Sequence, residues 1–252
     1  MLSKNQAREI RSLHLKKFRD AQNLFIAEGS KTVTEIIEQR PEIIKTVFAQ
    51  AAFIAGHRAI IAKTGIQVTE ISEDELRQIS LQSNPHLVLA ICRHFPVKKP
   101  DLSSQPFTLY LDDVRDPGNL GTIIRLCDWF GSRVLFCSPG CCELYNPKVI
   151  QSSMGAFLRV DVIYDGLSEV LHKHRFNAVY GALLEGKDLY REQLPPGLVL
   201  IGNEANGISA DNIKKINVPL TIPANNNNGS ESLNAAMAAA IIASEFFRQN
   251  RI

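Results

Sequence analysis

The sequence Gly229-Ser-Glu-Ser-Leu-Asn-Ala-Ala236 joins a run of asparagines to an alanine-rich apolar segment. Because alanine is the best helix former, residues 233–247 are predicted to form a helix. Either Ser230 or Ser232 can cap its first turn by accepting hydrogen bonds from free backbone N–H groups. Such a helix start favours an anionic ligand, and Ser232 and Asn234 are the side chains there that can take part in chemistry. The alternative is an ordinary helix after a polar loop, and this stretch alone does not distinguish it from a ligand-binding helix start.

The composition is that of a globular protein of 252 residues, long enough for one large or two modest domains. No uninterrupted apolar run of about 18 residues is present, so no membrane span is expected. The N-terminus lacks the apolar core of a secretory signal. Five cysteines, an odd number, favour reduced thiols and a cytoplasmic location. Cys137, Cys141 and Cys142 cluster without a second pair of ligands at zinc spacing, so we expect no metal.

Positive charge is concentrated at the front of the chain, although the net charge is only +2. Residues 1–100 contain 15 Lys and Arg against 10 Asp and Glu, whereas the remainder contains 13 against 16. A basic segment beside a nearly neutral body suggests a polyanionic partner, with a solvated helix face as the alternative. The residues predicted to contact such a polyanion here are Arg11, Lys16, Lys17 and Arg19.

The first hundred residues alternate between short strands and helices, which predicts a compact α/β domain over residues 1–96. The predicted strands are 24–27, 46–49, 67–71 and 87–92, and the predicted helices are 31–39, 51–63 and 72–80. Thr32 with Glu35 and Ser72 with Glu75 form the pattern of a capping box at two helix starts. Residues 97–106 are rich in Pro, Lys and Ser and are predicted to be a linker.

Residues 107–252 are predicted to form a second α/β domain around a parallel sheet, because its strands are almost wholly apolar. The predicted strands are 107–111, 134–137, 158–163, 178–183 and 198–201. The predicted helices are 120–130, with Asn119 as its N-cap, 147–154 and 167–174. Ligands of such sheets bind beyond the carboxyl ends of the strands. Three polar or glycine-rich loops fall at such ends, at 112–121, 202–209 and 223–232.

Each loop taken alone has a functional and an ordinary interpretation. Arg125, which follows the first loop, can hold a phosphate with its fork of donors, or pair with Asp116 or Asp128. In the second loop, Gly202 and Gly207 allow close approach of a ligand to the backbone, although the spacing is not a dinucleotide fingerprint. Glu204 between them is in most proteins simply exposed to solvent.

Taken in order, the three loops resemble the three motifs of the SpoU (TrmH) family of RNA ribose 2′-O-methyltransferases, within the SPOUT class. The resemblance covers residues 107–248 and includes Ser153-Met-Gly-Ala156 between the first two motifs. The segment from Ile10 to Gly29 is similar to the small substrate-binding domain of many members. That domain resembles a ribosomal-protein-like fold that binds kinked RNA.

The resemblance implies a C-terminal domain tied in a deep trefoil knot, a cofactor S-adenosylmethionine, and a homodimer whose sites borrow residues from the partner chain. It implies catalytic roles for Asn119, Arg125, Glu204, Ser232 and Asn234. The positions matched to the cofactor are Leu183, Ile201, Gly202, Glu204, Gly207, Ile222, Pro223, Ser232 and Leu233. Since many members with such a front domain act on ribosomal RNA, rRNA is the expected substrate.

The implied reaction is an in-line attack of a ribose 2′-hydroxyl on the sulfonium methyl. The enzyme has to align the reactants and help the hydroxyl to lose its proton. Arg125 is often cast as the base in this family, yet its pKa above about 12 makes the neutral guanidine scarce. We therefore expect Arg125 to clamp a phosphate and stabilise the forming alkoxide, with a phosphate oxygen or water as the proton acceptor.

Two departures from the family pattern are visible. The segment before Ser232 is about two residues longer than usual, filled by Asn225 to Asn228, and Ala235 stands where Val is common. Neither removes a catalytic group. The alternatives are a tRNA methyltransferase and an RNA-binding module without activity; a nucleotide-dependent oxidoreductase lacks its phosphate-binding fingerprint.

Overall fold

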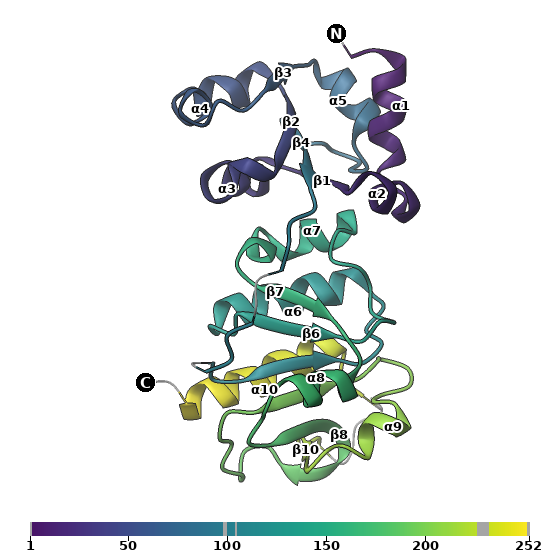
Figure 1. Ribbon diagram of the computed structural model, residues 1–252, viewed down its shortest axis with the longest axis vertical. Helices are drawn as coiled ribbons and strands as arrows, with labels where there is room; N and C mark the ends of the chain where they lie inside the picture. Colours follow the sequence, from purple (N-terminus) through teal and green to yellow (C-terminus); the bar gives the residue numbers. More distant parts are fainter. Residues whose placement is uncertain (1, 98–99, 104, 226–231, 251–252) are drawn as a thin grey trace. The chain divides into compact units, whose positions relative to one another are not determined.

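The computed structural model describes residues 2–97, 100–103, 105–225 and 232–250. The chain separates into two compact units (Figure 1). The first comprises Met1–Pro96 and Leu144–Leu158, and the second comprises Val97–Glu143 and Arg159–Ile252. Residues 144–158, which were predicted to belong to the second domain, are thus grouped with the first unit. In the part of the chain that the structure describes, no helix is both long and apolar enough to cross a membrane.

The first unit is built on a mixed sheet in the order β1-β4-β2-β3. Its strands are β1 (Leu24–Glu28), β2 (Ile44–Ala49), β3 (Val68–Glu70) and β4 (Val88–Arg93). Its helices are α1 (Lys4–Ser12), α2 (Lys16–Gln22), α3 (Ser30–Gln39), η1 (Pro41–Ile43), α4 (Ala51–Thr64), α5 (Glu73–Ile79), α7 (Pro147–Ser153) and η2 (Ala156–Leu158). The β4 strand is antiparallel to both of its neighbours, whereas β2 and β3 are parallel. The predicted α/β alternation is therefore present.

Side-chain caps mark the starts of α1, α5 and α7 in the first unit, whereas α2, α3 and α4 begin without one. The predicted capping box at the start of α5 is confirmed, since Ser72 and Glu75 bond each other's backbone N–H groups. The box predicted at Thr32 is wrong, because Gly29 is the N-cap of α3 and Thr32 lies inside the helix. Gly29 adopts a φ of 92°, a conformation that glycine reaches without strain.

The second unit is built on a six-stranded sheet in the order β10-β8-β9-β5-β6-β7, in which every neighbouring pair is parallel. Its strands are β5 (Thr108–Leu111), β6 (Val134–Cys137), β7 (Asp161–Tyr164), β8 (Val179–Asp188), β9 (Leu198–Ile201) and β10 (Val218–Thr221). Its helices are α6 (Pro117–Trp129), α8 (Leu167–Lys173), α9 (Ala210–Ile213) and α10 (Ala235–Asn250). The predicted parallel sheet is confirmed, and the central strands β5, β6 and β9 are wholly buried.

Helices α6 and α10 pack against each other and run in the same direction. Asn234, immediately before α10, bonds Asn119 in the first turn of α6. At the other end of the pair, the ring centroids of Phe130 and Phe247 lie 5.4 Å apart. The two helix starts therefore meet at one end of the pair.

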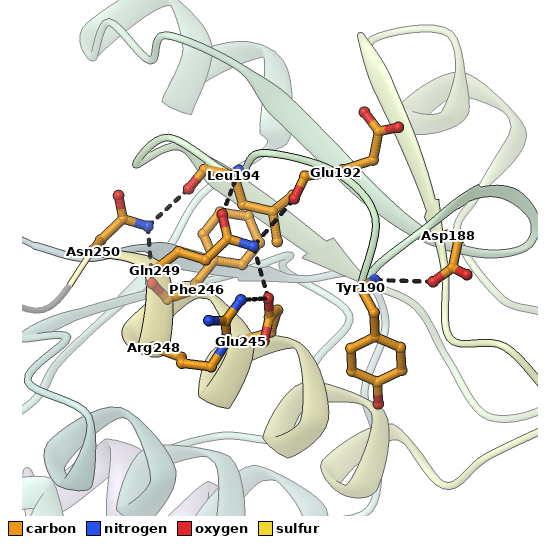
Figure 2. A network of polar contacts seen from close by, with 9 residues as sticks. All are labelled: Asp188, Tyr190, Glu192, Leu194, Glu245, Phe246, Arg248, Gln249 and Asn250. Atoms are coloured by element: carbon orange, nitrogen blue, oxygen red, sulfur yellow. Dashed lines mark hydrogen bonds and ion pairs between the residues drawn. The ribbon is translucent and has the colours of Figure 1, made fainter.

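The far end of α10 is fastened to the connection between β8 and β9, as Figure 2 shows. Gln249 accepts a hydrogen bond from the Leu194 backbone N–H at 2.9 Å and donates to the Glu192 carbonyl at 3.1 Å. Asn250 donates to the Leu194 carbonyl at 2.7 Å. The buried Glu245 carboxylate accepts from Arg248 and Gln249. The C-terminal helix is consequently held at both ends.

Candidate active site

The three predicted loops lie at one edge of the second unit's sheet. The first follows β5, the second follows its neighbour β9, and the third follows β10. Because all these strands are parallel, their carboxyl ends share that edge, where ligands of such sheets bind. Residues 226–231 of the third loop lie outside the described residues, and with them the predicted roles of Ser230 and of most of the asparagine run.

Asn119 joins the three loops through its side-chain amide. Its Nδ2 donates to the Glu204 carboxylate, and its Oδ1 accepts from Asn234 Nδ2 at 3.0 Å. Asn234 Oδ1 in turn accepts from the backbone N–H groups of Ala236 and Met237, at 2.9 and 3.2 Å. Each amide thus uses its oxygen and its nitrogen differently, so the orientation of both is determined by the network. The structure brings together residues that are up to 115 positions apart in the sequence.

The helix caps at this junction differ from the predicted ones. Asn119 is not the N-cap of α6; Asp116 is, and its carboxylate accepts from the Asn119 backbone N–H at 2.8 Å. Pro117 follows at the first helical position, where its fixed φ and missing N–H cost nothing. At α10 the capping side chain is Asn234 rather than Ser232. Because neither cap uses the Asn119 side chain, its amide can bridge the loops.

Arg125 lies on α6, six residues beyond Asn119. That spacing places it about 9 Å further along the helix axis and roughly 120° around it. Its side chain is exposed and makes no ion pair or hydrogen bond with the residues that the structure describes. The alternative pairing with Asp128 does not occur, because Asp128 binds Arg133 and Arg159 at 3.0 and 2.9 Å. The guanidinium is therefore available to a ligand.

Ser232 is not part of the junction in this structure. Its side chain is exposed and forms no hydrogen bond with any described residue. Of the five predicted catalytic residues, the structure therefore joins Asn119, Glu204 and Asn234 directly, whereas Arg125 and Ser232 are exposed and are not bonded to them.

Most residues matched to a cofactor lie at or after the ends of β9 and β10, and Leu183 lies in the middle of β8. Ile201 ends β9 and is buried, and Leu183 of β8 is tied to the end of β10 by a 2.6 Å hydrogen bond from Thr221 Oγ1 to its carbonyl. Gly202 packs so closely on Gly207 that an added Cβ would lie 2.2 Å from the Gly207 carbonyl carbon. The remaining matched positions follow these strands or precede α10: Ile222 is half-buried, whereas Glu204, Gly207, Pro223 and Leu233 are exposed.

A thiol beside the first loop has a perturbed pKa. Hydrogen bonding, chiefly from the Cys137 thiol, lowers the pKa of Cys141 to about 7, whereas burial raises the pKa of Cys137 itself. Cys141 is half-buried and also contacts the Leu111 carbonyl at the end of β5. Among the described residues, no group of His, Cys, Asp or Glu is arranged to hold a metal ion.

The basic residues of the first unit fall into two groups. Arg11, Lys16 and Lys17 are exposed, and the Lys17 ammonium lies 4.8 Å from the ring centroid of Phe18. Arg19, by contrast, is only 2% exposed and donates from Nη1 to the Leu13 carbonyl at 2.7 Å. Its burial does not fit the predicted contact with RNA, and we interpret Arg19 as a structural residue.

The first unit also contains a cavity of about 530 Å³ that no sequence pattern indicated. It is lined by Ile26, Glu28, Leu81, Gln82, Ser83, Asn84, His86, Pro147, Lys148 and Gln151. Burial raises the pKa of the Glu28 carboxyl, whose oxygens accept from the Ser80 hydroxyl and the Leu81 backbone N–H. Its residues are contributed by β1, the α5–β4 connection and α7, so only the folded chain brings them together.

Comparison with known proteins agrees with this geometry. Residues 106–244 match the family model of the SpoU rRNA Methylase family, and residues 4–90 match that of the MRM3-like substrate binding domain. The chain is 31% identical, over 95% of both chains, to the 23S rRNA (guanosine(2553)-2′-O)-methyltransferase of Bacillus subtilis. Among solved structures, a protein from Porphyromonas gingivalis described as a TrmH-family RNA methyltransferase aligns over 99% of both chains, with a TM-score of 0.85 and 36% identity. An AdoMet-bound rRNA methyltransferase from Sinorhizobium meliloti aligns over 98% of this chain and 96% of its own, with a TM-score of 0.85 and 26% identity.

Proposed function

This chain belongs to the SpoU rRNA methylase family, and from that premise we propose how its own residues carry out the reaction. It is an RNA ribose 2′-O-methyltransferase that uses S-adenosylmethionine, and ribosomal RNA is its substrate class. The observation that carries the site assignment is the junction at Asn119, which fixes the first, second and third loops around one point.

Methyl transfer from S-adenosylmethionine labelled in its methyl group tests this function. We expect the purified protein to transfer label to rRNA isolated from cells that lack it. The rRNA of those cells should also lack one 2′-O-methyl nucleotide. Label in tRNA instead would favour the tRNA alternative. RNA binding without any transfer would favour a binding module.

The residues matched to the cofactor suit S-adenosylmethionine. Ile222 and the 48%-exposed Leu233 offer apolar surface for a purine, and the glycine-flanked turn after β9 offers backbone groups without side chains in the way. When bound, the cofactor supplies a sulfonium methyl as the electrophile. We assign Leu183, Ile201, Gly202, Gly207, Ile222, Pro223 and Leu233 to its binding.

In the proposed mechanism the chain's own residues align and polarise the RNA. Arg125 holds a phosphate beside the target ribose and stabilises the charge that develops on the 2′ oxygen. Asn119, oriented by Glu204 and Asn234, holds the loops at the spacing the reaction needs. A phosphate oxygen or water accepts the proton. Ser232 orients the ribose once RNA is bound.

The first unit binds the RNA through Arg11, Lys16 and Lys17. Exposed Leu15 and Phe18 flank Lys16 and Lys17, which is typical of surfaces that contact phosphates and unstacked bases. Exchanging Lys16 and Lys17 for Glu is expected to weaken RNA binding. The slope of log Kd against the logarithm of the salt concentration should also fall by about 1.4, the value for two phosphate contacts on a single strand.

Filter binding across a salt series measures this change, with S-adenosylhomocysteine affinity as a check on the second unit. The matched control exchanges Arg58 and Lys63, exposed cations of α4, for Glu. An equal loss in that control would mean that overall charge, rather than this surface, attracts the RNA.

We further propose that two copies pair through α6 and α10. These helices expose large apolar side chains: Trp129, about one turn beyond Arg125 on α6, is 82% accessible, and Met237 on α10 is 58% accessible. Exposed apolar patches of this kind mark protein interfaces. A second copy on this surface would lie beside the site and complete it.

Replacing Trp129 by Glu is expected to convert a dimer to a monomer, because a charge would have to be desolvated in the centre of the interface. Sedimentation equilibrium measures the mass. Tyr190→Glu, at a 57%-exposed aromatic residue elsewhere on the unit, should leave the dimer intact. A Trp129→Glu protein that stays dimeric at micromolar concentration would contradict this interface.

The trefoil knot is also a proposal. The chain runs from β10 at one edge of the sheet back to α6, and its last turn is bonded to residues 192–194 before β9. Threading of the C-terminal segment through the preceding loop accounts for this path.

A cytoplasmic location is supported by the five cysteines, all present as thiols.

A further inference from the structure

Asp112, the residue directly after β5, has a carboxylate that holds the second loop although it lies in the first. The side chain is buried, with 5% of the residue exposed. Its Oδ2 accepts three hydrogen bonds: from the Ser209 backbone N–H and hydroxyl, both at 2.8 Å, and from Asn212 Nδ2 at 2.9 Å. A buried carboxylate is tolerated only when its oxygens are satisfied in this way. One side chain therefore ties β5 to a segment about 100 residues away.

The next residue, Asp113, holds the beginning of the same segment. Its carbonyl accepts from Asn203 Nδ2 at 2.8 Å, and its own N–H donates to Ser138 Oγ at 2.9 Å. Between these anchors the chain forms a closed turn, because Asn203 and Gly207 exchange backbone hydrogen bonds of 3.0 and 2.9 Å. Both ends of residues 203–209 are thus gripped by two consecutive residues of the first loop.

We propose that Asp112 is a positioning residue for the methyl donor. The inference rests on the proposed function, in which the backbone from Gly202 to Gly207 lies against the cofactor. Asp112 makes no contact with the ligand; it holds the turn in its binding conformation before the ligand arrives. Preorganisation of this kind raises affinity, because the loop is already ordered and loses little conformational entropy when the ligand binds.

A merely structural role predicts a different outcome, and the chain contains a matched control. Glu245 is also buried, with 7% of the residue exposed, and also accepts three hydrogen bonds, from Arg248 Nε, Arg248 Nη2 and Gln249 Nε2 (Figure 2). It belongs to the same unit but lies at the far end of α10. Removing either carboxylate should lower the melting temperature, whereas only Asp112 should affect the cofactor.

The experiment compares full-length Asp112→Ala, Glu245→Ala and the unaltered protein by calorimetric titration with S-adenosylhomocysteine and by thermal unfolding. We expect Asp112→Ala to raise the Kd by about tenfold or more, and Glu245→Ala to leave it unchanged. Equal affinity in Asp112→Ala and the unaltered protein, or an equal loss in Glu245→Ala, would overturn the inference. If the unaltered protein does not bind S-adenosylhomocysteine, the proposed function fails instead.

Two milder variants cover the case in which Asp112→Ala does not fold. Asn212→Ala removes one of the three donors, and Asp112→Asn keeps an acceptor but loses the charge. Each is expected to raise the Kd by a smaller factor, and the double variant by less than the product of the two, because both act on the same hydrogen bond. Multiplicative effects, or no effect of either change, would show that the carboxylate does not act through this segment.

Discussion

Replacing Arg125 by alanine is expected to lower kcat for methyl transfer by about 10²–10³-fold, the usual loss on removing one group that stabilises developing negative charge. The reason is that Arg125 is the exposed cation on α6, about 9 Å along the helix axis from Asn119, with no partner among the described residues to occupy it. Single-turnover methyl transfer to rRNA measures the effect. Affinity for S-adenosylhomocysteine should not change, because the guanidinium is assigned to the RNA.

Arg133→Ala is the matched control for this substitution. Arg133 is an exposed arginine of the same unit, but it is engaged by Asp128 at 3.0 Å. Its removal should leave the rate of methyl transfer unchanged, because its guanidinium is already paired with Asp128. The fold should also be retained, since an exposed ion pair contributes at most about 1 kcal/mol to stability. A rate lost equally in both variants would point to general electrostatic attraction of RNA instead of a role for Arg125 in the reaction.

The lysine variant distinguishes the two roles considered for Arg125. A clamp needs the planar fork, so Arg125→Lys should recover only part of the rate, with an unchanged pH profile. A base would behave differently, because a lysine has to lose its proton to act, near its usual pKa of about 10.4. Full activity with a shifted basic limb in the pH–rate profile of Arg125→Lys would therefore establish the base role.

The hydrophobic pattern was enough to predict most of the architecture. Alternating short apolar runs predicted every strand of the first unit, and the apolar runs of the second unit predicted a parallel sheet. The strand β10 was missed because Pro219 interrupts it. Proline is tolerated in edge strands, and β10 is an edge strand, but only the sheet order reveals that. Helix α9, of four residues, is too short to show a period.

The site was less predictable, because it depends on which of several similar side chains faces inward. Asp116, Asn119, Ser232 and Asn234 are all good N-caps, and sequence alone does not rank them. Likewise, the charge pattern of the first helices does not reveal that Arg19 turns inward to the Leu13 carbonyl. The contacts of Asp112 link residues about 100 positions apart, so no local pattern could have indicated them.

Asn234 has two separable roles, and the substitution Asn234→Asp is expected to remove only one of them. The aspartate keeps the oxygen that caps α10, where a negative charge also suits the helix dipole. It loses the N–H donor to Asn119 Oδ1, so two oxygens now face each other at the junction. Because this contact is exposed, its loss costs about 0.5–1.5 kcal/mol, or roughly a 2- to 13-fold loss in kcat/KM if the network orients the site. The retained cap and the negative charge at the helix start offset this loss in the folded state, so the melting temperature should change little.

Asn234→Ala completes the comparison, because it removes the cap as well and should also lose about 1 kcal/mol of stability. Thermal unfolding and methyl-transfer kinetics on the three proteins separate the effects. If Asp and Ala lose activity alike while only Ala loses stability, the donor to Asn119 is the functional contact. If Asn234→Asp is as active as the unaltered protein, the junction of the three loops serves only to start α10. Orientation of the Asn119 amide would then have to be removed from the mechanism.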